Sequence, residues 1–320
     1  MRALSGASVA VVAMLGLSPM VACAKIAAVK AMLTFKQANQ AYQSQDYQRA
    51  AQLYEETVQS NPELTQVYFF LGNGYDNLFK PGVSGRADND ALLAKAVQNY
   101  ALAADKLSAD KPDEVKLKKL SLQYLAAAFG SDKLNDPVKA EPIVQRMIQL
   151  DPGDTSNYFA LAKLYEDAGV YDEAEKFYLK AKEVKPNDPV VYTTLAGYYN
   201  RQGEFEKTIG ALEERSVKEP NNPEAFHMIA SYYWDEATRD ARLTDKQKGG
   251  YVQQGLQAVD KAIQLKPDYV EAITFKGLLL RLQANLEKDP AKQQALIKEA
   301  VVLHDKAEDI RKKKATGVSD

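Results

Sequence analysis

The stretch "YFALAKLYEDAGVYDEAEKFYLKAKEVKP" (Tyr158–Pro186) decides the fold, because its pattern recurs along the chain. Pro152, Pro186 and Pro220 follow one another at intervals of 34 residues. Alignment on these prolines superimposes residues of the same type: Tyr158 on Tyr192, Leu161 on Leu195, Ala162 on Ala196 and Tyr165 on Tyr199. Self-similarity at a fixed period of this length indicates a repeat protein.

Each repeat is predicted to contain two amphipathic helices that meet at small residues. Ala162 on the first helix and Ala174 on the second allow the two backbones to approach closely. The same roles fall to four further pairs: Ala196 and Thr208, Gly72 and Ala96, Ser121 and Ala140, and Ala38 and Ala50. Gly169 is expected to end the first helix in a left-handed conformation. Asp172 is expected to cap the second helix, and Pro186 to follow its end.

A 34-residue unit of this kind resembles the tetratricopeptide repeat, a helix–turn–helix module. The resemblance covers roughly residues 31–304. It implies an all-α fold, a right-handed superhelical α-solenoid in which neighbouring helix pairs stack and bury each other's apolar faces. We expect about seven units over residues 31–311, with insertions in units two, three, six and seven, the last unit acting as a cap. The extra residues fall near 79–95, 130–140 and 235–254, and residues 312–320 are expected to be a disordered tail.

Residues 1–22 have the layout of a bacterial export signal. Arg2 precedes the apolar run Val9–Leu17, and small residues follow. Three alternatives remain open at the end of this segment. Ala22-Cys23-Ala24 fits a signal peptidase site, Met20-Val21-Ala22-Cys23 resembles a lipobox that directs lipidation of Cys23, and the uncharged run could instead be an uncleaved anchor.

Cys23 is the only cysteine, and its position directly after a small residue favours lipidation. Residues 23–30 would then form a linker between the lipid and the repeats. All three alternatives place the repeats outside the cytoplasm. We therefore expect an exported protein in the periplasm or at the outer or cell membrane, with a lipid-anchored form favoured over a soluble one.

Composition and motifs argue against catalysis. The net charge of −2 does not indicate a nucleic-acid partner, and a single cysteine excludes an internal disulfide framework. The sequence has no phosphate-binding glycine loop, no G-x-S-x-G elbow and no H-E-x-x-H zinc helix. Asp88–Asp90 lacks the glycine and glutamate of a calcium loop, and is better interpreted as the cap of a helix that begins at Ala91. We expect no catalytic residue, metal or cofactor, and no enzyme.

The resemblance implies that the first helix of each unit lines a concave groove that binds a peptide or a partner helix. The candidate partner-binding residues are Phe35, Asn39, Tyr42, Phe69, Asn73, Lys118, Phe159, Lys163, Asn200, His227 and Trp234. The aromatic members suit an apolar peptide or an amphipathic helix. Some of them could instead pack against the chain's own segment Lys25–Leu33.

Two further patterns occur on the same helices. Asn39, Asn73 and Lys118 match three of the five residues with which some relatives hold a C-terminal carboxylate, but Phe35 and Leu122 occupy the other two positions. Five tyrosines recur at one repeat position and are interpreted as packing residues with a polar tip: Tyr75, Tyr124, Tyr165, Tyr199 and Tyr233.

These observations predict a non-catalytic scaffold for protein–protein interaction at the bacterial cell envelope. The alternatives are a soluble periplasmic adaptor, or an accessory subunit of an envelope transporter or enzyme complex.

Overall fold

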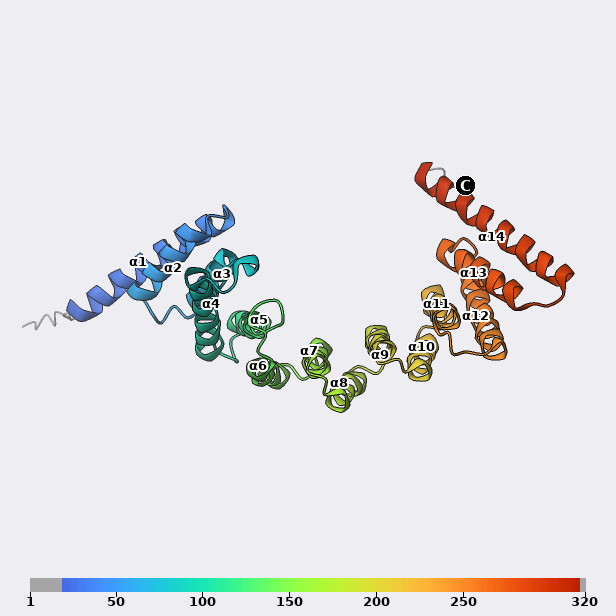
Figure 1. Cartoon of the computed structure of the whole chain (residues 1–320). Helices are drawn as coiled ribbons and strands as arrows, with labels where there is room; N and C mark the ends of the chain where they lie inside the picture. The colour runs from blue at the N-terminus through green and yellow to red at the C-terminus, as the bar shows by residue number, and fades with distance from the viewer. Residues whose placement is uncertain (1–18, 317–320) are drawn as a thin grey trace, which may run out of the picture. The chain divides into compact units, whose positions relative to one another are not determined.

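The computed structural model describes residues 19–316, with side chains from residue 26 to residue 315. This range contains fourteen α-helices, one short 3-10 helix and no strand, so the predicted all-α class is confirmed (Figure 1). Among the described helices, none combines the length and apolar character that a membrane crossing requires. The chain divides into two compact units, residues 1–152 (unit 1) and 153–320 (unit 2).

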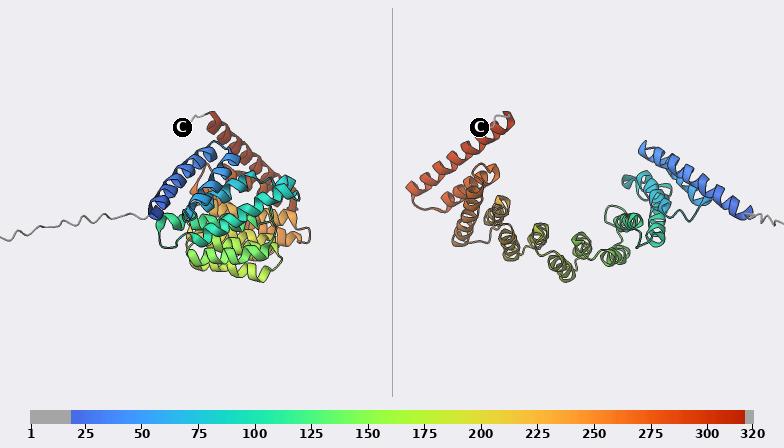
Figure 2. Two further views of the ribbon diagram at one scale, coloured as in Figure 1. Left: turned by 90° about the vertical axis from the view of Figure 1, so that its left-hand side faces the viewer. Right: turned by 180° about the vertical axis from the view of Figure 1, so that it is seen from behind.

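Unit 1 contains three helix pairs in which each first helix packs against the second helix that follows it (Figures 1 and 2). The helices are α1 (Pro19–Gln43), α2 (Tyr47–Ser60), α3 (Gln66–Leu78), η1 (Pro81–Val83), α4 (Ala87–Lys106), α5 (Pro112–Ala128) and α6 (Pro137–Leu150). Residues 23–30, expected as a linker, therefore belong to helix α1.

Unit 2 contains four further pairs. Its helices are α7 (Thr155–Asp167), α8 (Tyr171–Val184), α9 (Pro189–Arg201), α10 (Phe205–Lys218), α11 (Pro223–Arg239), α12 (Asp245–Leu265), α13 (Val270–Leu286) and α14 (Pro290–Thr316). Figure 1 shows the first helices α7, α9 and α11 on one side of this unit and the second helices α8 and α10 on the other. Residues 312–316, expected to be part of a disordered tail, lie in α14; residues 317–320 lie outside the described residues.

The small residues lie at the helix crossings as predicted. Ala162, Ala174 and Thr208 are fully buried. A Cβ atom on Gly72 would come within 2.7 Å of the Tyr100 ring, so only glycine fits between α3 and α4 at this point. The first helices α7 and α9 are each followed by a glycine with φ of +74°, Gly169 and Gly203. This left-handed conformation reverses the chain toward the second helix.

Two capping predictions were wrong. Val170 is the N-cap of α8, so Asp172 lies in the first turn of that helix. There its carboxylate interacts favourably with the helix dipole instead of binding a capped amide. Helix α4 begins at Ala87 rather than Ala91, and the Asn89 side chain instead bonds the backbone of Lys80 and Val83.

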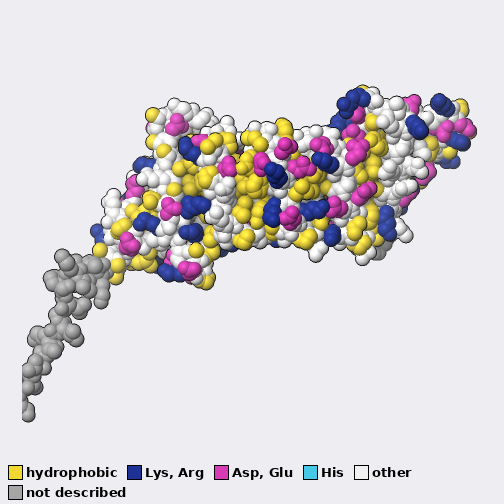
Figure 3. Space-filling view, turned by 90° about the horizontal axis from the view of Figure 1, so that it is seen from below, with side chains coloured by type: hydrophobic (Ala, Val, Ile, Leu, Met, Phe, Trp, Pro, Cys, Tyr) yellow, Lys and Arg dark blue, Asp and Glu magenta, His cyan; other side chains and the backbone are white. Residues whose placement is uncertain are grey.

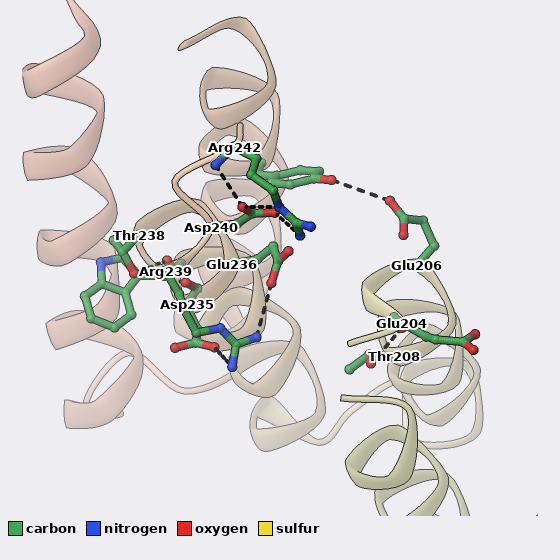
Figure 4. Close-up of polar contacts among 11 residues, drawn as sticks. Glu204, Glu206, Thr208, Asp235, Glu236, Thr238, Arg239, Asp240 and Arg242 are labelled. Carbon is green, nitrogen blue, oxygen red and sulfur yellow. Dashed lines mark hydrogen bonds and ion pairs between the residues drawn. The ribbon is translucent and has the colours of Figure 1, made fainter. Parts of the chain in front are cut away.

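The longest insertion extends a helix pair. Helices α11 and α12 have 17 and 21 residues, against 13 and 14 in α9 and α10. Thr244 and Gln247 form a reciprocal capping box at the start of α12. Tyr251 on the added part of α12 packs on Phe205, with 4.9 Å between ring centroids. Its hydroxyl lies 3.5 Å from the Glu206 carboxylate (Figure 4).

Tyrosine hydroxyls join the two helices within a pair. Three second helices carry a buried tyrosine that donates to a polar side chain of its own first helix: Tyr54 to Asn39 at 2.7 Å, Tyr100 to Asn73 at 2.9 Å, and Tyr178 to Glu166 at 2.9 Å. Burial raises the pKa of each of these hydroxyls, which keeps them protonated as donors.

A second set of tyrosines joins neighbouring pairs. Tyr75 on α3 donates to Glu55 on α2, and Tyr199 on α9 donates to Glu175 on α8 at 2.7 Å. Lys95 and Lys207 lie over these two rings, 4.7 and 5.1 Å from the centroids. The interpretation of the recurring tyrosines as packing residues with a polar tip therefore holds for Tyr75 and Tyr199. Tyr124 is more exposed, although its ring contacts Phe69 and Tyr100.

Candidate functional site

In unit 1, the apolar candidates for partner binding belong to the core. Phe35 and Phe69 are only 8% and 5% exposed. Phe35 packs on Phe70 at a centroid distance of 5.5 Å, and Phe69 packs on Tyr124 at 5.9 Å. Both rings are therefore unavailable to a partner, and the prediction that they line a groove was wrong. They pack on other rings rather than on the segment Lys25–Leu33, in which Leu33 is 60% exposed.

The polar candidates of unit 1 are occupied by internal hydrogen bonds. Asn39 and Asn73 accept from tyrosine hydroxyls, and Asn73 is buried. Lys118 donates to the carbonyl oxygen of Leu107 at 2.8 Å, at the end of α4. Tyr42 is half-buried, and its hydroxyl accepts from Asn77 at 3.1 Å. This arrangement provides no convergent set of donors for a C-terminal carboxylate.

The partner-binding residues predicted for unit 2 lie on its first helices. We call the surface of α7, α9, α11 and α13 the first-helix face. The repeat register places Asn200 and Trp234 at the same position of consecutive first helices, 34 residues apart. His227 precedes Trp234 by seven residues, two turns along the same side of α11. The three residues therefore lie on a common face of successive repeats.

Each of these three side chains has a polar group without a hydrogen-bond partner among the described residues. His227 Nε2 is buried, and it is the one buried side-chain nitrogen or oxygen without a hydrogen-bond partner among the described residues. The Asn200 amide and the Trp234 indole are half-buried, and neither has a side-chain hydrogen bond within the part of the chain that the structure describes. Buried polar groups are normally paired, so an unpaired one is a candidate contact for a ligand.

An aromatic cluster surrounds this position, formed by His227, Trp234, Tyr269 and Phe275. The His227 ring lies 5.0 Å from Phe275 and 5.4 Å from Tyr269, both with edge-to-face geometry. Trp234 packs on Phe275 at 5.8 Å. Tyr269 and Phe275 were not among the residues predicted from the sequence to line the groove. Alignment on Pro267 places Phe275 at the position of Met228, beside His227, which is the signal that could have found it.

Burial controls the charge of His227. It lowers the pKa of the imidazole below its ordinary value of 6.5, while the carboxylates of Glu271 and Glu224 act in the opposite direction. His227 is therefore neutral at pH 7, and its unpaired nitrogen can take part in one hydrogen bond. The site thus combines apolar ring surface with a few polar atoms at its edge.

The remaining candidates of unit 2 are less available. Phe159 is half-buried against Tyr178, with 6.2 Å between ring centroids. Lys163 is exposed on α7 and pairs with Asp167 at 2.6 Å. Exposed pairs of this kind are weak, so the Lys163 ammonium can still exchange its partner.

Glu166 joins α7 to α9. Its carboxylate accepts from Arg201 Nε at 2.7 Å and from Arg201 Nη2 at 3.0 Å, and also accepts from Tyr178. Its side chain is 7% exposed, whereas that of Arg201 is 48% exposed. The Arg201 hydrogen bonds hold the pKa of Glu166 below its ordinary value of 4.5, against the opposing effect of burial.

We expect Glu166→Gln to lower the free energy of unfolding at pH 7 by about 1–2 kcal/mol, because it removes charge-assisted hydrogen bonds. A lowered pKa in the folded state means that this stabilisation is present above the unfolded-state pKa, near 4.3, and is lost as the pH falls through the folded-state pKa. The difference between wild type and variant should therefore shrink at acidic pH in urea titrations. Glu183→Gln, in an exposed pair with Lys180, is the matched control and should change little. A difference that grows toward acidic pH would contradict the assignment.

The charged side chains near the α11–α12 turn pair with one another. Arg239 pairs with Asp235 and Glu236, and Arg242 pairs with Asp240, whose pKa it lowers to about 2 (Figure 4). Among the described residues, no group of three or more His, Cys, Asp or Glu side chains could hold a metal ion.

Basic and acidic side chains are interspersed on the face shown in Figure 3, and neither sign of charge forms a separate patch there.

A cleft of about 490 Å³ lies between α2, α3, η1 and α4 in unit 1. Several of its polar groups bond one another: Glu55 accepts from Tyr75, the Lys95 ammonium lies 3.2 Å from the Tyr75 hydroxyl, and Arg86 pairs with Asp88. Among the described residues, the cleft has no buried side-chain nitrogen or oxygen without a hydrogen-bond partner, in contrast to His227 on the first-helix face of unit 2.

Comparison with known proteins agrees with the repeat. The family model described as "Tetratricopeptide repeat" matches residues 133–198. The C-terminal part of a tetratricopeptide repeat-containing protein from Cytophaga hutchinsonii is a similar solved structure, with a TM-score of 0.55 and 16% identity, covering 86% of this chain and 98% of that one. No sequence among curated proteins matches the chain.

Two further solved structures are less similar. MamA has a TM-score of 0.39 and 21% identity, covering 57% of this chain and 93% of its own. YrrB, described as a tetratricopeptide repeat protein with an unusual peptide-binding site, has a TM-score of 0.39 and 18% identity, covering 61% and 89%.

The helix pairs, their spacing and the family match define the class of fold: the described chain is an all-α array of helix pairs, and residues 133–198 match the tetratricopeptide repeat. Repeats of this kind form interaction surfaces, and the tetratricopeptide repeat match supports a scaffold for protein–protein interaction.

Proposed function

We propose that the first-helix face of unit 2 binds a peptide or a helix of a partner protein, centred on Trp234. The observation that carries this proposal is the pair of unpaired polar groups on His227 and Trp234 within the aromatic cluster. The repeat register adds the Asn200 amide to the same face. Interface hot spots typically combine a large aromatic anchor with a few well-placed polar groups.

The chemistry of this face favours an amphipathic partner. The rings of Trp234 and Phe275 offer an apolar contact, and His227 and Asn200 can hydrogen-bond a backbone or side-chain amide. The Glu271 carboxylate acts on His227 from nearby, and the exposed Glu224 carboxylate, which pairs with Arg215 at 3.3 Å, does so too. A basic side chain next to the apolar anchor would therefore fit the rim beside Glu271. A helix with an apolar stripe bordered by lysine or arginine satisfies these conditions.

Photo-crosslinking in cells tests the location of this site. A crosslinking amino acid at position 200 should capture a discrete partner, to be identified by mass spectrometry. The same amino acid at position 217 is the control, because Val217 is 75% exposed on the second helix α10. Equal capture from both positions, or capture from position 217 alone, would refute the proposed face.

We further propose that the protein acts at the bacterial cell envelope, exported by residues 1–22 and anchored by a lipid on Cys23. The basis is the signal-like layout of the sequence; residues 1–18 lie outside the described residues, as does the side chain of Cys23. The alternatives are a soluble periplasmic adaptor and an accessory subunit of an envelope transporter or enzyme complex.

The Cys23→Ala variant tests whether the protein is anchored by a lipid. We expect the variant to lose the mass of the acyl chains and to be retained by the membrane fraction much less than wild type, because one or more buried acyl chains supply most of the binding energy. Fractionation and intact-mass spectrometry measure both effects. A wild-type mass without acyl chains would favour the soluble adaptor, and co-purification with a transporter or enzyme would favour the accessory subunit.

A further inference from the structure

The N-terminal half of α1 has an apolar face that no described residue covers. Ile26, Val29 and Leu33 are 69%, 62% and 60% exposed. Their spacing of three and four residues places them on one side of the helix. Ala31 and Phe35 on the opposite side are buried, and Phe35 packs on Tyr54 of α2. The helix is therefore apolar on both sides, but only one side is used by the fold.

The charges along α1 all have the same sign. The helix carries Lys25, Lys30 and Lys36 and no acidic residue, and the first acidic residue of the sequence is Asp46. Lys30 and Lys36 are exposed. On a helical projection they flank the stripe formed by Ile26, Val29 and Leu33, one on each side. A lysine in such a position can extend its ammonium group away from an apolar phase into the polar layer above it.

We propose that this face of α1, which we call the α1 stripe (Ile26, Val29 and Leu33), binds the surface of an anionic lipid bilayer with the helix parallel to the membrane. The apolar side chains would enter the boundary between headgroups and acyl chains, while the flanking lysines bind lipid phosphates. A second copy of the chain fits this face less well, because it would bring two lysine-flanked helices together without a compensating acid. The proposal is independent of the first-helix face of unit 2.

Vesicle binding tests the α1 stripe in the full chain. Cys23→Ala serves as the background, because it removes any acyl chain from the comparison. We expect this protein to sediment with vesicles of phosphatidylcholine mixed with phosphatidylglycerol, and much less with phosphatidylcholine alone. Adding Ile26→Glu and Leu33→Glu should weaken binding by more than about tenfold, since each change replaces an inserted apolar group with a charge of the same sign as the lipid.

A control pair of variants, a pair of lysine variants and a folding check complete the experiment. Val301→Glu and Val302→Glu alter exposed valines of α14 and should leave vesicle binding unchanged. Lys30→Gln and Lys36→Gln should lower affinity for the anionic vesicles by about fivefold for each lysine. Circular dichroism verifies that the helices remain folded, and Leu33→Glu alone replaces the double variant if they do not.

Three outcomes would overturn the proposal. Binding that the glutamate variants leave unchanged would assign membrane contact to another part of the chain. Equal binding to neutral and anionic vesicles would remove the role of the lysines. A change from dimer to monomer in the glutamate variants, without vesicle binding by the Cys23→Ala background, would show that a second copy covers the stripe.

Discussion

Replacing Tyr100 with alanine is expected to lower the free energy of unfolding by about 3–5 kcal/mol, the usual effect of removing a buried aromatic side chain. Tyr100 is fully buried on α4, and its ring fills the space beside Gly72. Its hydroxyl donates to Asn73 at 2.9 Å and lies 3.2 Å from the Asp76 carboxylate. The variant would therefore create a cavity and leave the Asn73 acceptor without its donor.

Urea titration with hydrogen exchange measures this effect, because exchange of peptides from α3 and α4 assigns the loss to unit 1. Tyr100→Phe keeps the ring and should cost about 1 kcal/mol, the typical contribution of one hydrogen bond. Tyr171→Ala is the control, since that side chain is 49% exposed. A loss for Tyr100→Ala no larger than that for the control would mean that the α3–α4 pair is not held together as described.

Replacing Trp234 with alanine is expected to weaken partner binding by about 2 kcal/mol or more, roughly thirtyfold in Kd, as for an aromatic hot spot. The loss follows from the apolar contact with the partner that Trp234 and Phe275 would share. Because Trp234 is the only tryptophan in the chain, its fluorescence should also change when the crosslinked partner, once purified, is titrated into the wild-type protein.

The half-buried position of Trp234 makes a second variant necessary. Asn200→Ala removes an amide without a side-chain partner among the described residues, so it should leave thermal stability unchanged and weaken partner binding by about fivefold. Val217→Ala should change neither quantity. If both Trp234→Ala and Asn200→Ala bind the partner as tightly as wild type, the site lies elsewhere on the protein.

The sequence predicted the features that repeat. The interval of 34 residues located the helix pairs, and the small residues Ala162, Ala174 and Gly72 lie at helix crossings because close packing there admits no larger side chain. Gly169 and Gly203 were predictable for a related reason, since the left-handed turn between two helices disfavours a Cβ atom.

Features that depend on neighbouring side chains were not predictable in this way. Phe69 has the spacing of a groove residue, but Phe70 and Tyr124 cover its ring. The residues inserted into α11 and α12 interrupt the register, which hid the contact of Phe275 with Trp234. The α1 stripe also escaped prediction, because an apolar residue in a sequence does not reveal on which side of a helix the rest of the protein packs.

The two sets of tyrosine hydrogen bonds also affect how the protein opens. Tyr178 ties α8 to its own first helix, whereas Tyr199 reaches from α9 back to Glu175 on α8. When one pair separates, the neighbouring pair loses a hydrogen-bond partner and becomes easier to separate. Fluctuations within unit 2 should therefore spread stepwise through adjacent pairs, and a partner that fixes α9 against α11 would slow hydrogen exchange in helices that it does not touch.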